Sequence, residues 1–155
     1  SAAQTFVGQN LGAAQPYRAA GAGWFAALYN AAMMTALAVA YHTFGRNIIR
    51  FFDSGAEVVE IGVSYVRAVG FSYVGLGIGI VLGAAMQGAG ATKRTLGLDS
   101  VVVFAFQLPL AWLVVFGLSL PLERLWQVIA WSYVAFAAVY VASYRRGKFL
   151  ATALP

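Results

Sequence analysis

The titratable side chains of this sequence do not form a pattern typical of a catalytic or metal site. There is one histidine, His42, and no cysteine, so a thiolate nucleophile, a thiolate metal site and a disulfide are excluded. No acidic residue lies in the apolar stretch that holds His42, and no serine lies in a GxSxG motif. We therefore predict a protein that is not an enzyme, with no catalytic residue, no metal and no cofactor.

Polar and polarizable side chains do occur inside the long apolar stretches. Asn30 follows Tyr29 in one of them, and Met33 comes about one helical turn later. An amide in such a stretch needs a hydrogen-bond partner, normally on a neighbouring helix. Aromatic rings and methionines suit a binding site for flat organic cations, and they suit core packing equally well. These three residues are candidates for a substrate cleft.

A second apolar stretch carries a series of glycines at Gly70, Gly75, Gly77, Gly79 and Gly83. Small residues four apart let two helices approach closely. The same series is also typical of a helix that flexes while a transporter changes conformation. Pro109, in a third stretch, frees a backbone carbonyl and predicts a kink or flexing point there. Packing and flexing both remain open for these positions.

The composition indicates the elements that position these residues. Hydrophobic residues make up 61% of the sequence and charged residues 10%, with a mean hydropathy of +0.76, whereas soluble domains carry about 25% charged residues. A small soluble domain has too little interior to bury so much apolar surface. Helices satisfy their own backbone groups in lipid. The sequence therefore predicts an all-α, polytopic transmembrane helix bundle with the lipid bilayer as its partner.

Uncharged stretches of roughly 20 residues, the length that crosses a bilayer, define the predicted spans. We predict four complete spans, at about residues 19–44, 68–87, 100–120 and 125–144. The segment 45–67 between the first two is an amphipathic connector. The first residues of the sequence predict the end of a preceding helix whose beginning lies outside it, so we interpret the sequence as a fragment.

Charges at the ends of the spans predict the orientation. One side holds Asp99 and six basic residues, a net charge of +5: Arg18, Lys93, Arg94, Arg145, Arg146 and Lys148. The other side is neutral, with four basic and four acidic residues: Arg46, Arg50, Arg67, Arg124, Asp53, Glu57, Glu60 and Glu123. We therefore predict an integral protein of the plasma (inner) membrane. By the positive-inside rule, both ends of the segment are expected to lie in the cytoplasm. Basic residues at span edges favour lipid headgroups over nucleic acid as a partner.

Two turn sequences carry more specific information. They are VGQNLGAAQPYRA (residues 7–19) and MQGAGATKRT (residues 86–95), separated by segments that include FFDSGAEVVEIGVSYVRAVGF. Together they resemble the multidrug and toxic compound extrusion (MATE) transporters, whose halves carry a GQ-x-x-GA-x-x-x-x-x-R-A turn and a QG-x-G-x-T turn. The matching residues are Gly8, Gln9, Gly12, Ala13, Arg18, Ala19, Gln87, Gly88, Gly90 and Thr92. The family's acidic residue before the threonine is replaced by Ala91, and its following proline is absent.

The resemblance implies the C-terminal lobe of a MATE-like twelve-helix fold. It implies part of a secondary active transporter that exports drugs or small organic cations by H⁺ or Na⁺ antiport, together with a missing N-terminal lobe of the same polypeptide. The family's fourth helix borders the central cleft, which makes Tyr73 and Gln87 further cleft candidates. No carboxylate lies within the predicted spans, so the coupling-ion site is expected outside this sequence.

Two alternatives remain open. A lipid-linked oligosaccharide flippase of the same superfamily would share the architecture. A non-transporting membrane subunit or scaffold would use the glycine-rich helix to bind a partner protein.

Overall fold

The computed structural model describes residues 1–153, and every regular element in that range is helical. The α-helices are α1 (Ala2–Gly12), α2 (Pro16–Phe52), α3 (Ala56–Val69), α4 (Ser72–Gly88), α5 (Thr92–Ser100), α6 (Leu108–Trp112) and α7 (Leu122–Arg145). Two π-helical segments, Val101–Gln107 and Leu113–Gly117, join α5 and α6 into one continuous rod, and a 3-10 turn, Leu150–Ala153, follows α7.

Local sequence signals explain where several helices begin and end. Ser1 and Gln4 form a capping box at the start of α1, which satisfies two backbone donors reciprocally. Pro16 occupies the first position of α2, where its missing N–H is not needed. Gly90 ends the turn after α4 with a φ of +80°, a backbone conformation that glycine adopts without strain.

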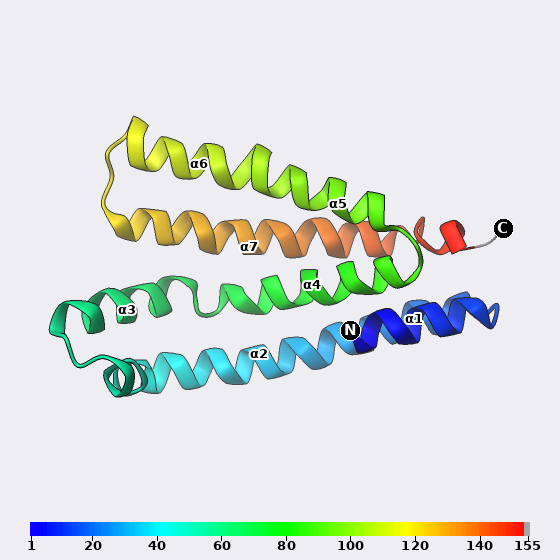
Figure 1. Cartoon of the computed structure of the whole chain (residues 1–155), viewed down its shortest axis with the longest axis horizontal. Coiled ribbons are helices and arrows are strands. Elements are labelled where there is room, and N and C mark those ends of the chain that lie inside the picture. The colour runs from blue at the N-terminus through cyan, green and yellow to red at the C-terminus, as the bar shows by residue number, and fades with distance from the viewer. Residues whose placement is uncertain (154–155) are drawn as a thin grey trace.

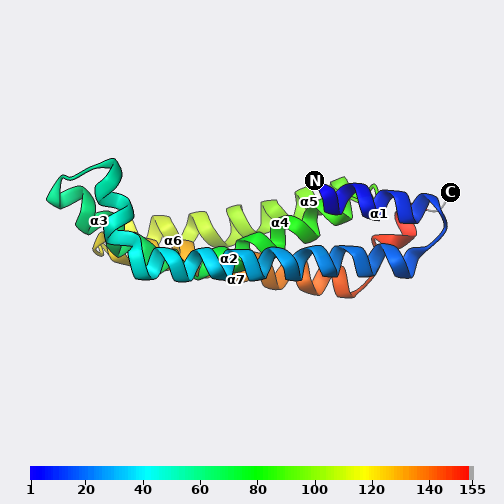
Figure 2. The ribbon, with the colours of Figure 1, turned by 90° about the horizontal axis from the view of Figure 1, so that it is seen from below.

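The long helices lie side by side in a single layer rather than around a closed centre. Their order across the layer is α5–α6, α7, α4 and α2 (Figure 1). Successive helices along the chain run in opposite directions, so the neighbours α4 and α7 run parallel to each other. The layer is seen edge-on in Figure 2, where α1 and the connection between α2 and α3 rise on the same side. The predicted bundle is therefore open, and both of its faces are available to other molecules.

The second predicted span contains a bend. Helices α3 and α4 meet at an angle of 60° near Gly70 and Phe71. A Cβ atom on Gly70 would lie 2.5 Å from the carbonyl oxygen of Val66, so the backbone there is too crowded for a larger residue. The bend thus falls at the first glycine of the predicted series, and flexing at residues 75–83 stays a prediction.

Three helical segments within residues 1–153 are long and apolar enough to cross a membrane: Pro16–Phe52, Thr92–Gly117 and Leu122–Arg145. The bent pair α3–α4 makes a fourth if it is counted as one span. Each overlaps one of the predicted spans, but α2 continues through about a third of the predicted connector to Phe52. The remainder of the connector is the extended Asp53–Gly55 link and α3.

The buried core gathers at the end of the layer where α1 packs. It includes Val7 of α1, Leu82 and Met86 of α4, Tyr140 of α7, and Phe149. Many large apolar side chains elsewhere are exposed, such as Phe25, Phe104 and Trp131, at 75%, 69% and 65%. Exposed apolar surface on this scale is expected only where lipid or another apolar element covers it.

Candidate functional site

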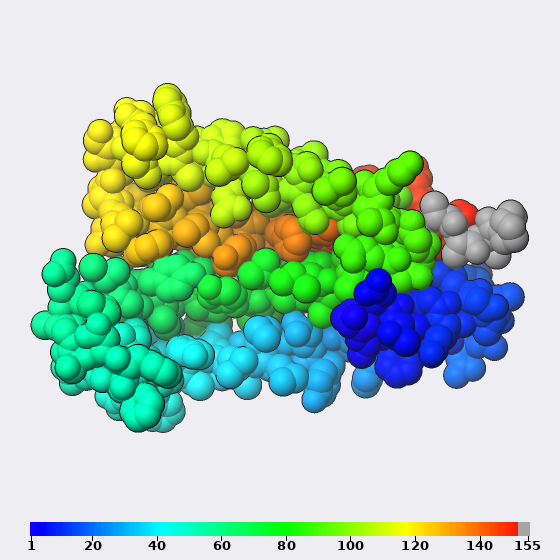
Figure 3. Space-filling model, in the orientation of Figure 1, coloured from blue at the N-terminus to red at the C-terminus, as the bar shows by residue number. Residues whose placement is uncertain are grey.

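The two turn sequences singled out above meet in space. Helix α1 carries the first, and its residues lie directly against α4, which leads into the second (Figure 3). A Cβ atom on Gly8 would lie 3.1 Å from the carbonyl oxygen of Gly88. Gly88 in turn has the backbone of Gln4 so close that no side chain fits. The glycines of the two turns therefore form one helix crossing.

The polar residues of the two turns have local partners or face outward. Arg18 donates a hydrogen bond to Gln15 at 3.1 Å, and Gln87 donates one to the hydroxyl of Thr95 at 3.4 Å. Gln9 and Thr92 are exposed, and nothing lies within 4 Å of a Cβ built on Gly12. These contacts fit a structural role in shaping the end of the layer.

The cleft candidates divide between two places. Tyr29 and Met33 are exposed on α2, and Tyr29 lines a surface hollow with Phe6 and Phe25. Tyr73 lies about four turns along α4 from Gln87, about 20 Å away at the helical rise per residue. The structure therefore does not join Gln87 to the other candidates.

Asn30 lies at the contact between α2 and α4. Its Oδ1 atom sits against Gly77, a position that has no room for a side chain. That oxygen is buried and accepts no hydrogen bond from any residue in the described range 1–153. A buried amide oxygen without a donor is costly. A hydrogen-bond donor from another molecule or segment that reached the Asn30 oxygen would therefore be favourable.

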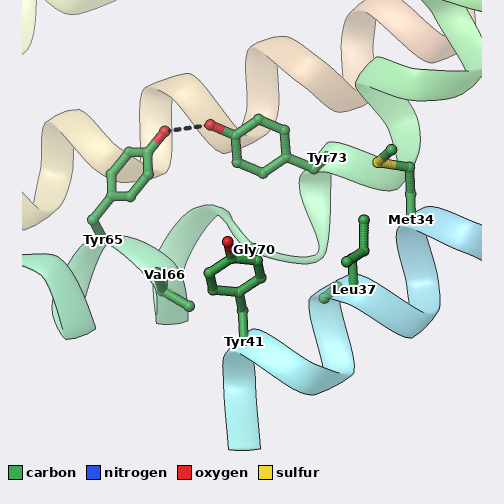
Figure 4. Close-up of a pocket in the computed structure, with 8 residues that line it drawn as sticks. Met34, Leu37, Tyr41, Tyr65, Val66, Gly70 and Tyr73 are labelled. Atoms are coloured by element: carbon green, nitrogen blue, oxygen red, sulfur yellow. Dashed lines mark hydrogen bonds between the residues drawn. The ribbon is translucent and has the colours of Figure 1, made fainter. Parts of the chain in front are cut away.

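A cavity of about 330 Å³ opens beside the bend between α3 and α4. Helix α2 contributes Met34, Leu37 and Tyr41 to its wall, while Tyr65 and Tyr73 face them across it (Figure 4). The two tyrosine hydroxyl groups lie 2.7 Å apart and hydrogen-bond across the bend. The wall is otherwise apolar, so the cavity suits an apolar or aromatic group.

Of these wall residues, sequence reasoning selected only Tyr73. The spacing of Met34, Leu37 and Tyr41 on α2 is a helical i, i+3, i+7 pattern, which was available as a signal. Tyr65 gave no such signal, because its place on the wall depends on the 60° bend.

The glycine series of α4 is occupied by neighbouring helices of the same chain. Gly75 lies against the backbone of Tyr133, Gly79 against the ring of Phe136, and Gly83 against Tyr140, all on α7. These contacts are the close approach that small residues at a spacing of four permit. Pro109 lies in the first turn of α6, directly after the π-helical segment Val101–Gln107, an irregularity that often accompanies a kink.

Asp99 is a polar residue that sequence reasoning did not select. It lies in α5, which continues into a membrane-length rod. The hydroxyl of Tyr140 donates a hydrogen bond to its Oδ1 at 2.5 Å and also lies 3.2 Å from the carbonyl oxygen of Thr95. Tyr140 is 2% exposed and Asp99 is partly buried, so this link between α5 and α7 is partly shielded from solvent. No group of three or more potential metal ligands occurs within residues 1–153.

Comparison with known proteins agrees with the resemblance of the turns. The MatE family matches residues 1–113 of the chain. A curated relative, probable multidrug resistance protein NorM of Bradyrhizobium diazoefficiens, is 24% identical over 148 residues. That match covers 93% of this chain but 32% of the relative, so the chain spans about a third of the relative's length. No solved structure gives a significant match.

The family match covers well over half of the chain and includes both turns whose glycines meet at the crossing of α1 and α4. It confirms the resemblance predicted from those turns, and it identifies an integral membrane protein of a class that transports rather than catalyses. The chain belongs to the MatE family of transporters.

Proposed function

We propose that this chain forms the C-terminal lobe of a twelve-helix exporter of drugs or small organic cations. The observation that carries this proposal is the open face of α2 and α4. There Tyr29 and Met33 are exposed on α2, next to Asn30, whose side-chain oxygen is buried against Gly77 without a donor within residues 1–153. A layer with two exposed apolar faces needs lipid on one side and protein or substrate on the other.

The coverage of the relative supports an incomplete transporter. The chain spans 32% of the probable multidrug resistance protein NorM, and that printed name is the reason for favouring drugs as substrates. In this proposal the missing N-terminal lobe faces α2 and α4, the two lobes enclose a central cleft, and both ends of the segment lie in the cytoplasm. Coupling to H⁺ or Na⁺ would use groups outside this chain.

The scaffold alternative gains no support from the glycine-rich helix. It required α4 to offer Gly79 to a partner protein, and the ring of Phe136 from α7 already occupies that position.

Ethidium efflux by cells that express the whole polypeptide tests the proposal. We expect faster efflux than in cells without the protein, and a loss of that difference when the H⁺ and Na⁺ gradients are both collapsed. Efflux that is identical with and without the protein would contradict drug export. A reporter fused after Arg146 would test the orientation, because it should be protected from reagents added outside the cell.

A further inference from the structure

A second, polar hollow borders the cavity beside the bend. The apolar cavity and the hollow share Tyr41 and Val66 in their walls. The hollow has a volume of about 300 Å³, and its lining includes Arg46, Asn47 and Arg67. Taken together as one depression, the two neighbouring hollows have an apolar part and a part that carries cationic side chains, the mouth.

The charge at this mouth is not fully compensated. Arg46 of α2 forms an ion pair with Glu60 of α3 at 2.8 Å. Arg67 is exposed and takes part in no salt bridge within residues 1–153. Arg67 therefore has no direct carboxylate partner in this range, although Glu60 lies near enough to interact with it electrostatically. A guanidinium group is well suited to bind a phosphate.

The surrounding aromatic residues indicate the level of the membrane surface. Tyr41, Tyr65 and Tyr73 surround the apolar cavity, and Trp126 of α7 packs against Tyr65 with ring centroids 5.0 Å apart. Tyrosine and tryptophan gather where hydrocarbon meets the headgroups. The apolar cavity then lies on the hydrocarbon side, and the arginines lie at headgroup level.

We propose that this depression binds one anionic phospholipid, with an acyl chain in the apolar cavity and the phosphate at Arg67. The shape and the charges both support this occupant. The wall of Met34, Leu37 and the tyrosines matches methylene groups, and the guanidinium of Arg67 matches the phosphate. A lipid held here would wedge α2 against the bent pair α3–α4, whose angle opens the cavity.

Native mass spectrometry of the intact protein, purified in detergent, tests the assignment. The probes are phosphatidylglycerol and phosphatidylcholine with identical acyl chains, together with inorganic phosphate. We expect a saturable phosphatidylglycerol adduct with roughly fivefold higher affinity than phosphatidylcholine, as one interfacial arginine provides. Inorganic phosphate should not displace it, because phosphate cannot fill the apolar cavity.

Two variants separate the charge from the cavity. Arg67→Gln should abolish the preference for phosphatidylglycerol. Leu37→Trp should weaken the binding of both lipids, because the larger side chain would fill the cavity; Leu37 is partly exposed, so the fold should tolerate the change. Arg50→Gln, which removes a neighbouring exposed arginine outside both hollows, should change neither. Circular dichroism and elution volume should be unchanged in all three variants. The proposal is overturned if Arg67→Gln and Arg50→Gln act alike, if Leu37→Trp has no effect, or if inorganic phosphate displaces the lipid.

Discussion

Gly8 and Gly88 approach each other so closely that a Cβ atom on Gly8 would lie 3.1 Å from the carbonyl oxygen of Gly88. Each glycine belongs to one of the two turn sequences, and the two glycines are separated by about half of the chain. The contact gives both motifs one physical purpose, which is to let α1 cross α4 without side chains between the backbones.

Replacement of Gly88 with alanine should loosen this crossing. The backbone of Gln4 leaves no space for a Cβ atom at Gly88, so α1 or α4 must move. We expect a loss of about 1–3 kcal/mol of unfolding free energy, the usual cost of forcing extra volume into a packed contact. Thermal unfolding of the purified chain in detergent measures this. Gly97→Ala is the matched control, because nothing lies within 4 Å of its Cβ position. Equal melting temperatures for the two variants would contradict the packing role of Gly88.

Much of the helical architecture could be predicted from the sequence because it depends on local properties. Hydropathy located the stretches that became α2, the α5–α6 rod and α7, since each is a run of apolar residues long enough to span. It also located the stretch that became α4, which reaches that length only together with α3. The bend at Gly70 could be predicted only as lying somewhere in the glycine series. One glycine among five in that region marks the break, and which one depends on the packing of α3 against α2 and α7.

The candidate site was harder to predict from the sequence than the fold, because the site depends on how each helix is rotated about its axis. Tyr65 and Tyr73 are eight residues apart, which places them on different faces of a straight helix, since eight residues advance by about 80° beyond two full turns. Their hydroxyl groups meet because of the bend. The role of Asp99 likewise depends on a tertiary contact, because its hydrogen-bond donor, Tyr140, comes from α7.

The glycine series on α4 provides a second test of packing. Gly79→Leu should collide with the ring of Phe136 and separate α4 from α7. We expect a loss of about 1–3 kcal/mol in unfolding free energy. Gly21→Leu is the control, since Gly21 is exposed with nothing within 4 Å of its Cβ position. If Gly79→Leu left stability unchanged but released a co-purifying protein, the scaffold alternative would be favoured instead.

The hydrogen bond between Tyr140 and Asp99 should contribute measurably to the docking of α5 on α7. Tyr140→Phe removes the donor and leaves a partly buried carboxylate without it, so we expect a loss of about 1.5–3 kcal/mol. A double-mutant cycle with Asp99→Asn, measured by thermal unfolding, should give a coupling energy of about 0.5–3 kcal/mol. Tyr17→Phe, at a site 93% exposed, is the control and should be neutral. Additive effects of the two substitutions would show that the pair does not interact.

Substitution of Asn30 can distinguish a role of this residue in the fold from a role in transport. Its Oδ1 atom is buried without a donor in the described part of the chain, so Asn30→Ala removes an unsatisfied acceptor. We expect the unfolding free energy of the 155-residue chain to stay within about 1 kcal/mol of the original or to rise. In the whole transporter the same change should slow ethidium efflux, because the contact between α2 and α4 would lose its polar group beside the exposed Tyr29 and Met33. Gln127→Ala, at an exposed position on α7 outside both hollows, should leave efflux unchanged. A marked loss of stability with normal efflux would instead make Asn30 a purely structural residue.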